Sequence, residues 1–206
     1  MSLFCFLWIP LFYFFWRSLA GNDTSAGEGW ALLGGILIAL IQLFLGPFVE
    51  PGGFGFYRWL SACIDIVVLP AVLPFLAYFL LKKSGIIKEA VNPAGFTLLW
   101  LIPGAVIRSL FWSSLNDPIL LIIVPILWAA IAVGAPFFIK LIQKNSRTFV
   151  IVLSSLGILV VPSAAASSYW AFFSHKTYLG FLFLFAATAP MLVSVAFSFL
   201  NPAGRT

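Results

Sequence analysis

The chain has 206 residues, of which 63% are hydrophobic and 8% charged, with a formal net charge of +5. Soluble domains carry about a quarter charged residues, so this composition excludes an ordinary water-soluble fold and favours a protein embedded in the lipid bilayer. We expect one integral membrane domain over residues 1–206. Its predicted fold is an all-α transmembrane bundle of six or seven spans, several of them kinked by proline.

Seven apolar stretches predict the spans, because a bilayer crossing takes about 20 predominantly apolar residues. The first stretch is the shortest. It has no basic segment ahead of it and Arg17 lies at its C-terminal side, so we interpret it as a retained span or a re-entrant anchor rather than a signal peptide. The predicted spans are 3–17, 30–49, 58–81, 94–114, 118–140, 148–173 and 178–200.

The basic loop residues are divided unevenly between the two sides of the predicted bundle. One side carries eight of them, and the other carries Arg58 and Lys176. Because cytoplasmic loops hold the excess of Lys and Arg, we expect the first side and the C-terminus to face the cytoplasm, in the inner membrane. The N-terminus is then outside with seven spans and inside with six. The eight residues are Arg17, Lys82, Lys83, Lys88, Lys140, Lys144, Arg147 and Arg205.

Proline recurs inside five consecutive predicted spans. Each proline removes a backbone donor and tends to kink its helix, which membrane proteins tolerate where neighbouring helices or waters satisfy the freed group. Two interpretations stay open: ordinary membrane-helix prolines, or helix breaks that line an internal cavity. These residues are Pro70, Pro74, Pro103, Pro125, Pro136, Pro162 and Pro190.

Small and aromatic residues predict where the spans pack. Glycine and alanine pairs such as Gly34-Gly35 would let helix backbones approach closely. Most tryptophans and tyrosines lie near span ends, as in the aromatic belts of membrane proteins. Trp100 and Trp128 lie nearer span interiors, so we expect them to be packing residues.

Two charges lie at membrane depth, where an ionisable side chain is costly and faces a partner or a cavity. Asp65 lies about 10 Å, and Arg108 about 9 Å, below the outer ends of consecutive antiparallel spans. We predict that they form an ion pair in the outer half of the membrane. This pair belongs either to a polar, outward-facing ligand pocket or to a structural salt bridge that fixes helix register.

Other polar residues share this outer level and complete a predicted ligand-binding cluster. The cluster consists of Glu50, Tyr57, Arg58, Asp65, Arg108, Asp117, Ser167 and Ser168. The sequence has no HExxH, CxxC, GxSxG or P-loop motif, so we expect no catalytic residue and no enzyme activity. No metal site or cofactor is expected either, because His175 is the single histidine and both cysteines, Cys5 and Cys63, lie in apolar runs.

Two local patterns resemble known families. Leu98-Leu99-Trp100-Leu101-Ile102-Pro103, followed by Pro125-Ile126-Leu127-Trp128, resembles spans of the bacterial Yip1-like multi-pass membrane family, a resemblance that covers residues 30–170. Arg58-Trp59-Leu60-Ser61-Ala62-Cys63-Ile64-Asp65 is similar to the opening of an RDD-family span. The Yip1-like resemblance implies a role in membrane trafficking or in transport-associated assemblies, without established catalytic residues.

The sequence therefore predicts a non-enzymatic membrane subunit of a transport or envelope assembly, which binds a partner or passes a lipid or small molecule. The expected partners are the lipid bilayer and other membrane subunits. No nucleic acid and no direct nucleotide binding is expected, because neither a recognition motif nor a P-loop is present. Two alternatives stay open: a substrate-capture protein similar to the S-components of vitamin importers, and an ion or proton antiporter that uses Asp65.

Overall fold

The computed structural model describes residues 7–20, 27–45, 55–87, 93–111, 118–144 and 146–200, and every regular element within them is helical. The predicted all-α fold is therefore confirmed for this part of the chain. The elements are α2 (Trp8–Ala20), α3 (Gly27–Leu45), α4 (Phe56–Cys63), the π-helix η2 (Ile64–Val72), α5 (Leu73–Lys83), α6 (Pro93–Phe111), α7 (Pro118–Lys144), α8 (Thr148–Phe173) and α9 (Thr177–Leu200).

Four helices are long and apolar enough to cross a membrane, so the chain is a membrane-embedded protein. They match the spans predicted at 58–81, 118–140, 148–173 and 178–200. In α3 and α6 the described apolar stretches are shorter, and α2 has 13 residues, so the total of six or seven spans stays a prediction. The four long helices are Phe56–Lys83, Ile122–Gln143, Thr148–Phe173 and Thr177–Ala196.

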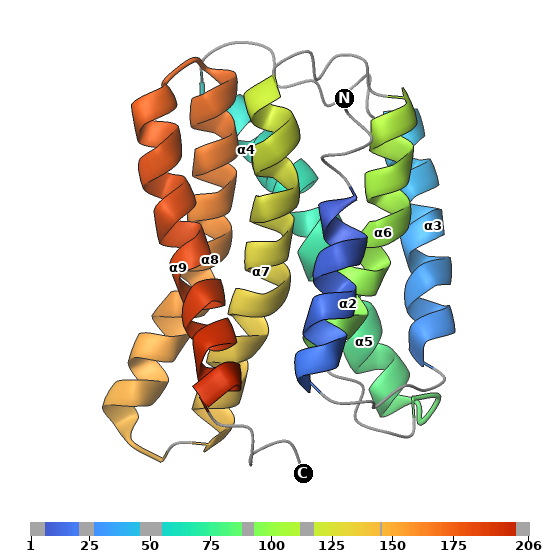
Figure 1. The fold of residues 1–206 in the computed structure, drawn as a ribbon, viewed down its shortest axis with the longest axis vertical. Helices are drawn as coiled ribbons and strands as arrows, with labels where there is room; N and C mark the ends of the chain where they lie inside the picture. The colour runs from blue at the N-terminus through green and yellow to red at the C-terminus, as the bar shows by residue number, and fades with distance from the viewer. Residues whose placement is uncertain are drawn as a thin grey trace.

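One continuous helix, Phe56–Lys83, joins two groups of helices, and we call it the third helix. It consists of α4, η2 and α5. In one group, α7, α8 and α9 all contact one another; in the other, α6 packs against α2 and α3 (Figure 1). The third helix contacts α8 through α4 and contacts α6 through α5, while η2 touches α6, α7 and α8. It therefore crosses from one group to the other.

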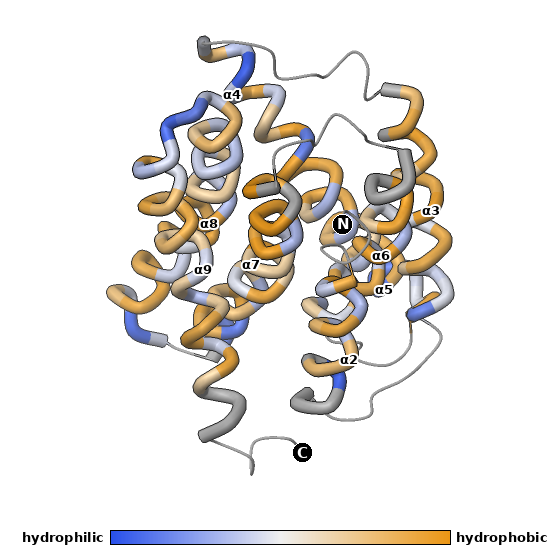
Figure 2. The backbone as a smooth tube through the Cα atoms, turned by 45° about the horizontal axis from the view of Figure 1, so that its top comes forward, coloured by the Kyte–Doolittle hydropathy of each residue, from blue (hydrophilic) through white to orange (hydrophobic). Residues whose placement is uncertain are grey.

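The direction of the helices explains how the charges are distributed. Successive helices run in alternate directions, so the C-terminal ends of α2, α5 and α7 lie at the same end of the bundle as the N-terminal ends of α3, α6 and α8 (Figure 1). The most hydrophilic segments lie mainly at helix ends (Figure 2). This arrangement separates Arg58 and Lys176 from the basic residues Arg17, Lys82, Lys83, Lys140 and Arg147. Which end faces the cytoplasm stays a prediction from the positive-inside bias.

Glycines set the closest helix contacts. A Cβ atom built on Gly34 of α3 would overlap the indole ring of Trp100 in α6, and one built on Gly35 would overlap the Trp100 carbonyl oxygen. Only a residue without a side chain allows this approach, so the predicted close-packing role of Gly34-Gly35 is confirmed. On the other side of the bundle, a Cβ on Gly157 of α8 would come within 2.5 Å of the Phe138 ring of α7.

Candidate functional site

The third helix adopts π-helical hydrogen bonding over Ile64–Val72, with Pro70 inside this segment. An α-helix disfavours an internal proline, because the ring clashes with the preceding turn and no N–H is available for the backbone ladder. The wider π-turn is a known local solution to such strain, and π-helical turns occur frequently at functional sites. The predicted break at Pro70 therefore takes the form of a changed helix type in the middle of a membrane-crossing helix.

Asp65 lies near the start of this π-helical segment and is 7% exposed. Its neighbours Ile66 and Val67 are also buried, and the segment faces α6, α7 and α8. Asp65 interacts with another group of the protein. A carboxylate buried at membrane depth is costly and marks a functional site by default. The burial of Asp65 is consistent with the expectation that a charge in an apolar run faces a partner or a cavity, while its place in a ligand-binding cluster stays a prediction.

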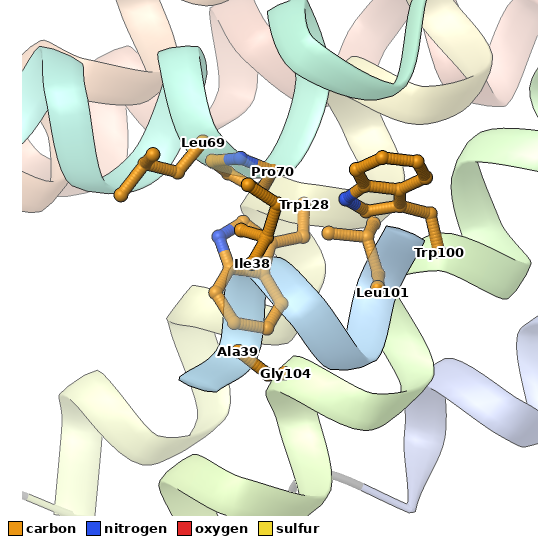
Figure 3. Close-up of a pocket in the computed structure, with 9 residues that line it drawn as sticks. Ile38, Ala39, Leu69, Pro70, Trp100, Leu101, Gly104 and Trp128 are labelled. Carbon is orange, nitrogen blue, oxygen red and sulfur yellow. The ribbon is translucent and has the colours of Figure 1, made fainter. Parts of the chain in front are cut away.

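A small apolar cavity is lined by Pro70, which follows Asp65 by about one π-helical turn in the third helix. The indole rings of Trp100 in α6 and Trp128 in α7 line it together with Pro70 (Figure 3). Gly35 of α3 contributes to the same wall. The space open to the centre of a water molecule is about 10 Å³, which is close to what one water occupies. This cavity joins α3, the third helix, α6 and α7.

The indole N–H of Trp100 is the polar group of interest in this wall. Its nitrogen is buried and has no hydrogen-bond partner among the described residues. An unsatisfied buried donor costs about 1–3 kcal/mol, so the cavity favours a ligand small enough to fit and able to accept a hydrogen bond. The arrangement suits a single water molecule beside the π-helical segment.

Two serines of the predicted cluster tie α8 to its neighbours. The Trp59 indole N–H donates a hydrogen bond to Ser167 Oγ at 3.1 Å, which joins α4 to α8. Ser168 is fully buried, and its hydroxyl donates to the Gly180 carbonyl oxygen at 2.9 Å, which joins α8 to α9. Tyr57, in contrast, is 84% exposed at the start of α4. The structure thus brings Ser167 to the α4–α8 contact through Trp59, and turns Ser168 toward α9.

The remaining members of the predicted cluster lie wholly or partly outside what the structure describes. Glu50 and Asp117 are not among the described residues, and for Arg108 only the backbone of α6 is described. The Asp65–Arg108 ion pair therefore stays a prediction. The neighbourhood of the two helices that carry these residues is confirmed, because α6 contacts both η2 and α5.

A polar contact that the sequence did not indicate joins α2 to α3. The Tyr13 hydroxyl donates to Glu28 Oε1 at 2.9 Å, and the Arg17 guanidinium lies 3.6 Å from the same oxygen. Tyr13 is buried, as is Ile9 one turn before it. The available signal in the sequence was a pair of opposite charges, Arg17 and Glu28, placed close together along the chain, and the hydroxyl of Tyr13 completes the contact.

Replacing Ser168 by alanine is expected to destabilise the protein by about 1 kcal/mol, because the side chain loses its buried hydrogen bond to α9. The measurement is the thermal unfolding midpoint in detergent, followed by circular dichroism. Ser155→Ala is the matched control, since Ser155 is exposed and donates only to the Ile151 carbonyl of its own helix. Equal midpoints for the two variants would contradict the role assigned to Ser168.

Among the residues that the structure describes, no group of three or more His, Cys, Asp or Glu side chains is arranged to hold a metal ion. The features that stand out instead are the buried Asp65, the π-helical segment around it and the cavity between Trp100 and Trp128. Comparisons with family models, curated proteins and solved structures find no match for this chain, so the Yip1-like and RDD-like resemblances stay predictions.

Proposed function

We propose that this protein is a non-enzymatic membrane transport subunit in which the third helix gates the passage of a lipid or small molecule between the two helix groups. The observation that carries the proposal is the buried Asp65 within a nine-residue π-helical segment that contacts both groups. An ionisable residue at membrane depth and a break in regular helical hydrogen bonding are each typical of solute pathways, and here they coincide.

The π-helical segment provides a place where the third helix can change shape. Its backbone bonds reach five residues back rather than four, so a change between the two patterns rotates α5 relative to α4. Pro70 opposes a regular α-helix at the same point, which makes the two patterns closer in energy than in an uninterrupted helix. Because η2 touches α6, α7 and α8, such a rotation would be transmitted to both helix groups.

The size of the cavity between Trp100 and Trp128 helps to distinguish passage of a substrate from its capture. The cavity holds about one water molecule, so a larger ligand enters only when the surrounding helices separate. A substrate-capture protein similar to a vitamin-importer S-component would need that opening before it binds anything. Passage coupled to movement of the third helix therefore fits the described packing better than capture in a preformed pocket.

The assembly part of the proposal rests on the outer faces of the helices. Large apolar side chains are exposed along α8, including Phe149, Leu153 and Leu156. Such faces are covered by lipid or by helices of another subunit. Purification in a mild detergent, followed by mass spectrometry of the retained chains, tests this part: stable companion subunits support it, and a chain that is always isolated alone contradicts it.

Asp65→Asn is expected to slow passage about tenfold, equivalent to about 1.4 kcal/mol in the barrier, because the amide cannot carry the charge that the pathway uses. The measurement is the movement of a fluorescent phospholipid and of a small fluorescent solute across proteoliposomes. Glu28→Gln is the control, since Glu28 is a partly exposed carboxylate at the α2–α3 contact. If wild-type proteoliposomes are no more permeable than empty vesicles, the proposal is wrong.

The buried carboxylate also favours a second candidate, an ion or proton antiporter. The same proteoliposomes distinguish it when a pH gradient is imposed and a pH-sensitive dye is enclosed. An antiporter exchanges protons for a cation in the wild type and loses this exchange in Asp65→Asn, with unchanged unfolding temperature. Normal exchange by Asp65→Asn would exclude this candidate.

A further inference from the structure

Arg58 stands out at the end of the bundle that carries few basic residues. Its Nη1 atom is buried and has no hydrogen-bond partner, and no ion pair to its guanidinium is present among the described residues. A guanidinium is permanently charged and offers five N–H donors. Arg58 as a whole is half-buried, and an enclosed N–H of a charged group is costly without an acceptor, so this position favours an acceptor that is itself anionic.

The length of the third helix places Arg58 at the level of lipid headgroups. The helix has 28 residues, which corresponds to about 40 Å, whereas the hydrocarbon core of a bilayer is about 30 Å thick. Arg58 lies two residues from the start of this helix, and Lys82 and Lys83 lie at its other end. Both ends therefore extend beyond the hydrocarbon, into the zone that contains the lipid phosphates.

A second cation lies at the same corner of the bundle. The hydrogen bond from Trp59, the residue after Arg58, to Ser167 holds α4 against α8. Trp170 follows Ser167 by about one helical turn along α8. The Lys176 ammonium lies 5.8 Å from the centre of the Trp170 ring, on the turn between α8 and α9. Arg58 near the start of α4 and Lys176 after the end of α8 therefore lie at the same end of the bundle, near the α4–α8 contact.

We propose that Arg58 and Lys176 bind the phosphate group of an anionic membrane lipid at this corner. The guanidinium donates two parallel hydrogen bonds to phosphate oxygens, a geometry that a lysine cannot reproduce. Lys176 adds a second positive charge, and the indoles of Trp59 and Trp170 lie where the headgroup meets the acyl chains. This inference is independent of the role proposed for Asp65.

The test compares lipid retention by the full-length protein and its variants. Each protein is reconstituted with equal amounts of phosphatidylglycerol and phosphatidylcholine, extracted in a mild detergent and analysed by native mass spectrometry. Wild-type protein is expected to retain phosphatidylglycerol preferentially. Arg58→Gln is expected to reduce this preference about tenfold, and Lys176→Gln about threefold. Lys83→Gln, which removes an exposed charge at the opposite end, is expected to leave it unchanged.

Two further arms decide whether the site and its ligand are as proposed. Inorganic phosphate is titrated into lipid-depleted protein in detergent; binding as strong as that of the lipid would show a soluble anion as the ligand and overturn the lipid proposal. Equal retention by wild type and Arg58→Gln, or an equal loss in Lys83→Gln, would also overturn it. Arg58→Lys keeps the charge and loses the paired hydrogen bonds, so partial retention is expected even if the glutamine variant does not fold.

Discussion

Gly35→Ala is expected to lower the thermal unfolding midpoint by roughly 6–12 °C, because α3 and α6 touch at this residue without space for a side chain. The added Cβ would overlap the carbonyl oxygen of Trp100 and lie 3.2 Å from the Pro103 ring. Neither group can turn away as a flexible side chain would, so the two helices must separate. Overpacking of this kind costs about 3 kcal/mol, and each kcal/mol lowers the midpoint of a chain of this size by about 2–4 °C.

Gly95→Ala is the matched control, since it makes the same chemical change in α6 at a position with open space. A Cβ on Gly95 meets nothing within 4 Å, and alanine favours a helix by up to about 1 kcal/mol relative to glycine. This variant is therefore expected to unfold at the same temperature as the wild type or above it. Equal losses in both variants would show that helix propensity, and not the α3–α6 contact, determines the result.

Sequence reasoning found the long spans because their signal is local. A run of about 20 apolar residues is recognisable without knowing its neighbours, and the helices at 58–81, 118–140, 148–173 and 178–200 follow from it. The interior position of Asp65 followed from a similar argument, because a charge in an apolar run cannot face lipid cheaply. Both inferences depend on the free energy of transferring a side chain from water into hydrocarbon, which is a property of the residue type and does not require knowledge of the fold.

The π-helical segment was not predictable from Pro70 alone. A proline predicts a break in the helix, but the break can be a kink or a wider π-turn. Which of the two forms depends on how the segment packs, and η2 packs against α6, α7 and α8. The cavity is likewise formed by Trp100, Trp128 and Pro70 from three separate helices. These three side chains come together only in the tertiary structure, so no local sequence pattern predicts the cavity.

The two serines show the same limit within the predicted cluster. The sequence indicated only that Ser167 and Ser168 are polar residues near a span end. Their partners are Trp59, which is 108 residues from Ser167, and the Gly180 carbonyl, 12 residues from Ser168. Adjacent hydroxyls on a helix point in different directions, so one reaches α4 and the other α9. Their contacts join helices, a role that sequence alone did not separate from ligand binding.

Trp128→Ala is expected to destabilise the protein by about 3–5 kcal/mol, the largest effect among the single substitutions considered for this chain. Trp128 is 2% exposed in α7, the most buried of the four long helices, and it faces the cavity beside Trp100. Truncation removes most of the packing surface of the side chain and enlarges the cavity, because α3 and the third helix cannot close over the space. The measurement is the thermal unfolding midpoint in detergent by circular dichroism.

Trp8→Ala is the matched control for Trp128→Ala, because Trp8 is 64% exposed at the start of α2. In detergent its indole is surrounded by acyl chains in both the folded and the unfolded protein, so its removal is expected to change stability by less than about 0.5 kcal/mol. Trp128→Phe retains an aromatic ring and should fall between the two. An equal loss for Trp8→Ala and Trp128→Ala would contradict the central position of Trp128, and with it the cavity beneath the π-helical segment.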